Sequence, residues 1–205
     1  HLDNGERSFS YWRSASAARS LADDRQTLAG AMEDADILYF SGITLAILPA
    51  EGRATLLELA GAQRLKGKIV AFDPNIRPRL WGSKEEMLET ISAGARAASI
   101  VMPGFDDEAV HFGDASVDAT VSRYRSLGAE TVIAKDGARG ATIATAEGSI
   151  HVPAFPPREI VDTTSAGDSF NGGYLARIAG QATCRPPPQP LRHGSPPPSS
   201  AIPAR

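Results

Sequence analysis

Several features that define whole classes of proteins are scarce or missing in this chain. It contains one cysteine, Cys184, which cannot form an internal disulfide, and this fits a protein of the reducing cytoplasm. Its longest apolar runs, such as residues 69–72, have the length of a core strand and are far too short to span a membrane. Neither sign of charge dominates, because 21 Lys and Arg face 24 Asp and Glu for a net charge of −3. We therefore expect no membrane and no nucleic-acid partner.

The beginning of the chain also lacks familiar signals. It starts at His1 rather than at methionine, and no secretory signal pattern follows. We expect that the sequence begins inside a longer gene product. Its 205 residues are enough for one domain with a sizeable core.

Composition divides the chain into two parts. Residues 1–180 have the mixed composition of a folded domain, whereas residues 181–205 hold more than half of the prolines and no Asp or Glu. Proline fixes φ and removes a backbone donor, so we expect residues 181–205 to form a disordered, proline-rich tail. A proline-rich ligand for an SH3-like partner and a shifted reading frame are the alternative interpretations.

Apolar periodicity predicts alternating strands and helices through the domain. We expect strands at residues 8–13, 36–42, 68–73, 99–102, 131–135, 141–145, 149–152 and 159–161. We expect helices at residues 50–65, 84–98 and 117–127, the second of them opened by a capping box between Ser83 and Glu86. Such alternation is typical of an α/β fold with a mostly parallel sheet, in which ligands bind beyond the carboxyl ends of the strands. Asp73, Asn75 and Arg77 would lie at that edge.

The stretch at residues 162–174, Asp-Thr-Thr-Ser-Ala-Gly-Asp-Ser-Phe-Asn-Gly-Gly-Tyr, carries the clearest chemical pattern. It opens a predicted helix in which Phe170, Tyr174 and Ile178 are spaced four apart on one face. Small residues at the helix start expose backbone amides, and the helix dipole is positive there, so the amides can bind an anion. Asp168 is ionised at neutral pH and could accept a proton from a hydroxyl that attacks a phosphate. The alternative is that Asp168 caps the helix and the glycines form a turn.

This stretch resembles the second signature of the PfkB carbohydrate kinases, which have a ribokinase-like fold. The resemblance implies a three-layer α/β sandwich that is incomplete in this chain, with ATP and Mg²⁺ as cofactors. It also implies that Asp168 is the catalytic base and that the amides of Ala166 and Gly167 form the anion hole. Ser165 stands in the nucleotide-binding loop, at a position where many members have glycine.

Two further segments are similar to the 2-keto-3-deoxygluconate kinases of this family. Residues 5–13, Gly-Glu-Arg-Ser-Phe-Ser-Tyr-Trp-Arg, would place Tyr11 and Arg13 on the sugar acid. Residues 73–81, Asp-Pro-Asn-Ile-Arg-Pro-Arg-Leu-Trp, would place Arg77 on the substrate carboxylate or on the transferring phosphate. A guanidinium can bind a carboxylate through two hydrogen bonds, which suits an acidic sugar. Packing on an exposed strand and an ordinary basic turn are the structural alternatives.

The same resemblance suggests further contacts to the nucleotide and its metal. Lys135 and Gly137 match a Lys-x-Gly turn beside the nucleotide, although a surface hairpin explains them equally well. Glu108 matches a glutamate that organises magnesium, but the asparagine that normally precedes it is absent here. The alternative is that Asp106, Asp107 and Glu108 stabilise the dipole of a helix.

The resemblance implies ATP-dependent phosphorylation of the terminal hydroxyl of 2-keto-3-deoxygluconate. A fructokinase or ribokinase type of sugar kinase remains an alternative, as does an inactive fragment that acts at most as a binding module. The family's N-terminal Gly-Gly signature and the segment that closes its adenine pocket are missing, so we expect this chain alone to be poorly stable or inactive. Members of the family often dimerise, which leaves a homo-oligomer open.

Overall fold

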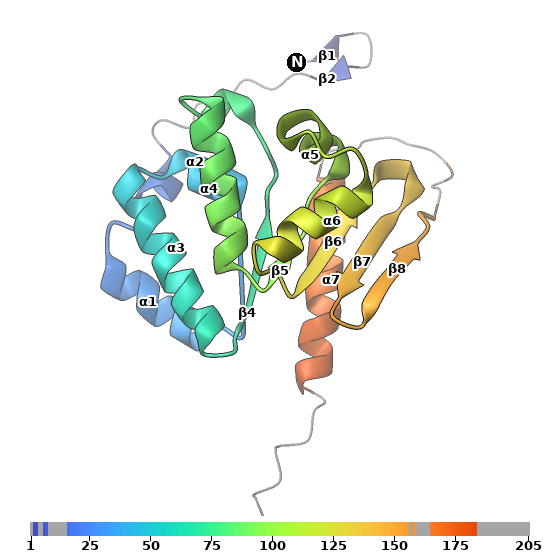
Figure 1. Cartoon of the computed structure of the whole chain (residues 1–205). Coiled ribbons are helices and arrows are strands. Elements are labelled where there is room, and N and C mark those ends of the chain that lie inside the picture. Colours follow the sequence, from blue (N-terminus) through green and yellow to red (C-terminus); the bar gives the residue numbers. More distant parts are fainter. Residues whose placement is uncertain (1, 4–5, 8–15, 156–157, 159–164, 184–205) are drawn as a thin grey trace, which may run out of the picture.

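The structure, a computed structural model, describes residues 2–3, 6–7, 16–155, 158 and 165–183 (Figure 1). The strands are β1 (Leu2–Asp3), β2 (Glu6–Arg7), β3 (Ile37–Ser41), β4 (Ile69–Asp73), β5 (Ile100–Val101), β6 (Thr131–Lys135), β7 (Ala141–Thr145) and β8 (Gly148–Val152). The α-helices are α1 (Arg25–Asp34), α2 (Gly42–Ile47), α3 (Ala50–Leu65), α4 (Lys84–Ala97), α5 (Phe105–Phe112), α6 (Val117–Ser126) and α7 (Ala166–Thr183). Short 3₁₀ turns are η1 (Ala17–Ser20), η2 (Pro78–Leu80) and η3 (Gly137–Arg139).

Strands β3 to β8 form one sheet in which spatial order follows chain order. Neighbours from β3 to β6 are parallel, while β7 and β8 return antiparallel. Helices connect the parallel strands, which brings the carboxyl ends of β3 to β6 to one edge of the sheet. The register pairs Ser41 with Asp73 there, and an isolated bridge joins Gly104 to Lys135. The mostly parallel α/β sheet predicted from the sequence is confirmed.

Side chains that alternate along β4 divide the core between the two faces of the sheet. Val70 and Phe72 belong to a large cluster that is covered by α1, α2, α3, α4 and α6. Ala71 belongs to a smaller cluster on the other face, where Tyr174 and Ile178 of α7 pack against it. Figure 1 shows α7 behind the strands and α3, α4 and α6 in front of them. The molecule therefore has the three layers that the sequence predicted, although α7 alone covers one face among the described residues.

The predicted apolar face of α7 is only partly correct. Tyr174 and Ile178 pack against the sheet, as expected, but Phe170 is exposed. The deeply buried residue in the first half of the helix is Asn171, which is 2% exposed. A polar side chain thus takes the place that periodicity gave to an apolar one.

Most predicted boundaries match the structure, and α3 matches its prediction at both ends. Only one of the two hydrogen bonds predicted for the capping box is present. Ser83 Oγ accepts a hydrogen bond from the Glu86 amide at 3.1 Å, but the Glu86 carboxylate accepts from the Gly82 amide and from Arg53 instead of from Ser83. The Glu86 carboxylate does not bind the Ser83 amide because Arg53, on the neighbouring helix α3, donates a charged hydrogen bond to it at 2.7 Å.

Some predicted segments lie outside the described residues, namely the strands at 8–13 and 159–161 and the tail from residue 184. Helix α7 continues to Thr183, slightly beyond the change of composition at residue 181. Within the described ranges, none of the helices combines the length and the apolar character that crossing a lipid bilayer requires.

The start of α2 lies unusually close to the loop that follows β4. A Cβ atom added to Gly42 would collide with the carbonyl oxygen of Pro74 and would lie 2.6 Å from Ile91 Cδ1. The Ser41 hydroxyl caps the same helix by accepting the amide of Thr44. Only glycine allows this approach, and it fixes the loop that carries Asp73 to Arg77.

A buried ion pair joins α5 to α6. The Glu108 side chain is fully buried, and its Oε2 accepts hydrogen bonds from Arg123 Nη2 at 2.6 Å and from the Tyr124 hydroxyl at 2.9 Å. Arg123 also binds Asp114 at 2.7 Å and stacks on the ring of Phe112. Burial raises the pKa of Glu108 to about 7, although Arg123 and Tyr124 act to lower it.

Replacing Gly42 by alanine should lower the free energy of unfolding by about 1–3 kcal/mol, because the methyl group has no room beside Pro74. Gly61→Ala on α3 is the matched control: its added Cβ meets nothing within 4 Å, so helix propensity should raise stability by about 0.5–1 kcal/mol. Urea unfolding of both variants measures the difference. Equal effects at the two positions would contradict the close approach.

The free energy of unfolding of Glu108→Gln, relative to that of the parent chain, should increase as pH rises from about 4.5 to 8. The pKa of Glu108 in the folded protein, about 7, exceeds the ordinary value of 4.5 for a glutamate, so its contribution to stability is complete below pH 4.5 and is lost as pH rises through 7. Glutamine mimics the protonated carboxyl at every pH. The difference in unfolding free energy should therefore grow by up to about 3 kcal/mol across this range, measured by urea denaturation at several pH values. Parallel stability curves would show that the carboxyl titrates normally.

Candidate active site

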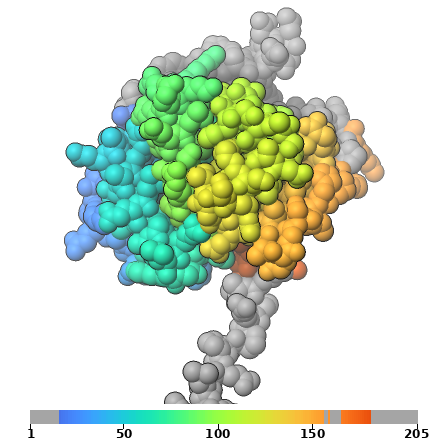
Figure 2. Space-filling model, viewed as in Figure 1, coloured from blue at the N-terminus to red at the C-terminus, as the bar shows by residue number. Residues whose placement is uncertain are grey.

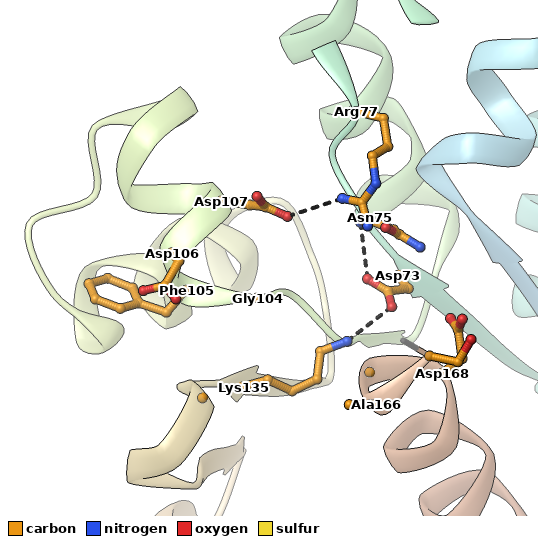
Figure 3. A pocket seen from close by; sticks show the side chains of 13 residues that line it. Asp73, Asn75, Arg77, Gly104, Phe105, Asp106, Asp107, Lys135, Ala166 and Asp168 are labelled. Atoms are coloured by element: carbon orange, nitrogen blue, oxygen red, sulfur yellow. Dashed lines mark hydrogen bonds and ion pairs between the residues drawn. The ribbon is translucent and has the colours of Figure 1, made fainter. Parts of the chain in front are cut away.

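A pocket of about 440 Å³ lies at the carboxyl edge of the parallel strands, beside the start of α7 (Figure 3). Four segments contribute to it: the loop after β4, the start of α5, the end of β6 with its turn, and the first turn of α7. The lining residues are Asp73, Asn75, Arg77, Gly104, Phe105, Asp106, Asp107, Lys135, Gly137, Ser165, Ala166, Gly167 and Asp168. The predicted ligand edge of the sheet is thus where the pocket lies.

The loop after β4 is shaped by its own first residue. Asp73 Oδ1 accepts a hydrogen bond from the backbone amide of Asn75 at 3.0 Å, which closes a tight turn. Asn75 adopts a left-handed backbone with φ of 35°, a conformation that asparagine tolerates better than most residues. The turn sends Arg77 over the pocket, where its guanidinium lies 3.7 Å from the carboxylate of Asp107 and is half exposed.

The first turn of α7 brings together the four residues that the sequence singled out there. Ser165 has φ of 59°, and its carbonyl accepts the first helical hydrogen bond, from the Ser169 amide at 2.8 Å. A left-handed backbone favours glycine, which explains why glycine is common at this position in the kinases that the motif resembles. Ala166 and Gly167 follow without bulky side chains, and the carboxylate of Asp168 is exposed to the pocket.

Lys135, at the end of β6, reaches the same point from the sheet. Its ammonium donates to Asp73 Oδ2 at 3.0 Å and to Asn171 Oδ1 at 3.2 Å. A Cβ atom on Gly167 would lie 3.7 Å from Lys135 Nζ, so the positive charge stands beside the backbone of the helix start. Because the helix dipole is also positive there, the two effects add to make an anion site.

Gly137 lines the pocket from η3, the turn after β6. Its φ of 52° is again left-handed, which suits a glycine. Asp136, beside it, forms an ion pair with Arg139 that holds the turn closed. The Lys-x-Gly segment therefore forms the turn of the antiparallel β6–β7 hairpin, and this turn lies at the pocket.

The sequence interpretation missed four residues in or next to the site, namely Asp106, Asp107, Asn171 and Tyr39. Asp107 faces the pocket, and burial raises its pKa while the Arg77 charge opposes that shift. Asn171 is buried next to the pocket, where it binds Lys135 and Asp73, and its amide also donates to the hydroxyl of the partly exposed Tyr39 at 3.2 Å. The position of Asn171, three residues after Asp168 in the helical motif, was the one available signal, because residues three apart share a helix face.

The structure separates Glu108 from the pocket, which corrects its expected placement beside magnesium. Its carboxylate is buried between α5 and α6, bound to Arg123 and Tyr124, and it does not line the pocket. Successive helical residues point about 100° apart, so Asp106 and Asp107 face the pocket while Glu108 turns into the core. Tyr11 and Arg13 lie outside the described residues, and their predicted role in substrate binding stays a prediction.

The donor chemistry of the pocket fits a magnesium ion that arrives with phosphates. Mg²⁺ prefers carboxylate, phosphate and water oxygens and is usually held by one or two carboxylates plus substrate phosphates. Asp106 and Asp107 offer such oxygens at the rim. Among the described residues, no three His, Cys, Asp or Glu side chains gather into a group that could hold a metal ion, so no closed metal cage is present in that part of the chain.

A larger apolar groove of about 740 Å³ adjoins the pocket and shares Lys135, Gly137, Ala166 and Gly167 with it. It runs between α7 and the face of β7 and β8, and its apolar walls include Ile143, Val152, Phe155, Phe170 and Tyr174. Figure 2 shows the opposite face of the molecule, on which α3, α4 and α6 form a continuous surface.

The chain matches the pfkB family carbohydrate kinases over residues 1–185. It is 41% identical over 182 residues to a 2-dehydro-3-deoxygluconokinase of Escherichia coli K12, an alignment that covers 86% of this chain and 59% of that protein. It is also 41% identical over 177 residues to the 2-dehydro-3-deoxygluconokinase of Dickeya dadantii, covering 84% and 57% of the two chains. The chain therefore spans less than two thirds of the length of these relatives.

Solved structures of sugar kinases share the fold of this chain. A PfkB protein from Polaromonas sp. JS666 superposes with a TM-score of 0.67 at 31% identity, over 75% of this chain and 49% of that one. An aminoimidazole riboside kinase from Salmonella enterica, complexed with aminoimidazole riboside and an ATP analogue, superposes at 0.60 with 37% identity, over 70% and 50%. Sequence and fold agree, and the chain belongs to the pfkB family of carbohydrate kinases.

Proposed function

We propose that this chain carries the phosphate site and the catalytic base of an ATP-dependent kinase that phosphorylates the terminal hydroxyl of 2-keto-3-deoxygluconate. The observation that carries the proposal is the juxtaposition at the start of α7. There an exposed Asp168 carboxylate, the backbone of Ala166 and Gly167 and the ammonium of Lys135 border one pocket. Two relatives at 41% identity are named as kinases of this sugar acid.

The reaction needs a base, an anion site and alignment. Asp168 accepts the proton of the sugar hydroxyl as its oxygen bonds to the terminal phosphorus of ATP, and the bond to the bridging oxygen breaks to release ADP. The amides at the start of α7 and the Lys135 ammonium stabilise the negative charge on the transferring group. The base and the amides of the anion site thus lie on the same helix, α7, whereas Lys135 contributes its charge from β6.

The nucleotide would occupy both hollows at once. Its phosphates would lie against Ser165, Gly167, Gly137 and Lys135, and its base would enter the adjoining apolar groove. The two hollows share Lys135, Gly137, Ala166 and Gly167, and this continuity supports the placement. Magnesium supplies charge neutralisation on the phosphates, and Asp106 and Asp107 would hold it at the rim.

An acidic sugar fits the cationic side of the pocket. Arg77 is half exposed and pairs with Asp107 only at 3.7 Å, a weak contact that a bidentate substrate carboxylate would replace. Tyr11 and Arg13 are proposed to complete this subsite. The alternative for Arg77 is the transferring phosphate.

A second sugar specificity has support from one relative. An aminoimidazole riboside kinase of Salmonella typhimurium is 42% identical over 153 residues, covering 71% of this chain and 44% of that protein. Its named substrate lacks the carboxylate of a sugar acid, so the role of Arg77 separates the two assignments.

Asp168→Asn should reduce phosphorylation at least a hundredfold while the affinity for ATP changes little, because the amide keeps the size of the side chain but cannot accept a proton. A coupled assay of ADP release with a panel of sugars measures the turnover of the polypeptide that contains residues 1–205. Calorimetry measures its affinity for ATP. Ser92→Ala on α4 serves as a control away from the pocket. Unchanged turnover in Asp168→Asn would end the assignment of the base.

Arg77→Lys should raise the KM for 2-keto-3-deoxygluconate about tenfold and leave the KM for ATP unchanged, since lysine keeps the charge but loses the bidentate geometry. The same assay with each substrate varied in turn measures both constants. A rise in the KM for ATP alone would assign Arg77 to the phosphate instead. A different result would favour the riboside kinase assignment. In that case the parent chain has no activity on the sugar acid, and Arg77→Lys does not change its turnover of uncharged sugars.

A further inference from the structure

Asn171 is a buried polar residue with no role in the chemistry proposed above. Its side-chain amide donates one hydrogen bond to Asp73 Oδ2 at 2.6 Å and another to the Tyr39 hydroxyl at 3.2 Å. Its carbonyl oxygen accepts from the Lys135 ammonium at 3.2 Å. One amide group on α7 thus binds residues on β3, β4 and β6.

These contacts allow only one orientation of the amide. The NH₂ group faces the Asp73 carboxylate and the carbonyl faces the Lys135 ammonium. A flipped amide would place its carbonyl oxygen against the carboxylate and its NH₂ group against the ammonium, so that acceptor would meet acceptor and donor would meet donor. Both N–H groups and the carbonyl oxygen have partners, which a side chain that is 2% exposed requires. The contact is therefore specific in direction as well as in place.

Asn171 is also placed to control the catalytic side chain. It follows Asp168 by three residues, so both lie on the same face of α7, one buried and one exposed. A rotation or a shift of α7 that moved Asp168 away from the pocket would break the bonds of Asn171 to the sheet. The rest of α7 makes apolar contacts through Tyr174, Leu175 and Ile178, which resist sliding and rotation less strictly than directed hydrogen bonds do.

We propose that Asn171 is a positioning residue, which holds the start of α7 against the sheet and fixes the Lys135 ammonium beside the anion-binding amides. The use of this position for phosphate rests on the proposed function, whereas the anchoring itself does not. Asp73 takes part by binding Lys135 and Asn171 through the same oxygen. Asn171 acts through these neighbours and touches no reacting atom.

The test compares Asn171→Leu, which keeps the size of the side chain and removes its hydrogen bonds, with Gln63→Ala. Gln63 is a buried polar residue on α3, away from the pocket, and serves as the control for a general loss of stability. Hydrogen–deuterium exchange of residues 169–173, the first amides of α7 that are bonded within the helix, reports its anchoring. Calorimetric titration with tripolyphosphate reports the anion site without requiring turnover.

Asn171→Leu should speed exchange at the start of α7, leave exchange in α3 and α4 unchanged, and weaken tripolyphosphate binding about tenfold to a hundredfold, as expected for loss of bonds to charged groups. Gln63→Ala should do neither. Combining Asn171→Leu with Asp73→Asn should weaken binding less than the product of the single effects, because both act through Lys135.

Unchanged exchange at residues 169–173 in Asn171→Leu would overturn the positioning role, and so would an equal local effect of Gln63→Ala. If the parent chain does not bind tripolyphosphate but the exchange result holds, the anchoring is supported and the proposed phosphate site is contradicted. The two proposals therefore fail separately.

Discussion

A lysine ammonium and an aspartate carboxylate meet at the carboxyl edge of the sheet, where both side chains are largely shielded from water. The pair of Lys135 and Asp73 joins the central strands β4 and β6, and Asn171 adds α7 to the same contact. A buried charge that loses its partner is costly, so each member keeps the others in place. The position of α7 thus depends on a polar contact as well as on the apolar core.

The apolar core supports this arrangement unevenly. On one face of the sheet five helices bury a large cluster, while on the other the described residues include only α7, over a small one. A helix with so little apolar contact needs directed bonds to hold its orientation. The hydrogen bonds of Asn171 to Asp73 and Lys135 supply them. The open groove beside α7 is the space that remains on this face.

Helix α5 shows how a single element serves the site and the core at once. Asp106 and Asp107 face the pocket, and Glu108, the next residue, is buried against Arg123. The 100° turn between successive residues separates the two functions. Burial accounts for the raised pKa of Glu108, because its carboxylate is removed from water with a limited number of partners.

Much of the fold could be read from local patterns in the sequence. Periodicity located β4, β6 and α3 closely, since each needs a regular apolar face to be buried, and the motif at residues 162–174 located the start of α7 and its carboxylate. The line of polar residues after β4 was also predictable, because the carboxyl ends of parallel strands share an edge.

Other features depend on residues that are distant in the sequence and meet only when the chain folds. Periodicity on α7 suggested an apolar face, but Asn171 is buried there because Asp73 and Lys135 satisfy its amide. A run of three acidic residues could not reveal which of them faces the pocket, because that depends on how α5 packs against α6. The sequence by itself located most strands of the main sheet, helices α3, α4 and α6, and the chemical groups at the start of α7, but it did not indicate α1 or α2. Tertiary structure alone decided the partners of Lys135, Asn171 and Glu108, since hydrogen bonds between separate elements depend on how those elements pack.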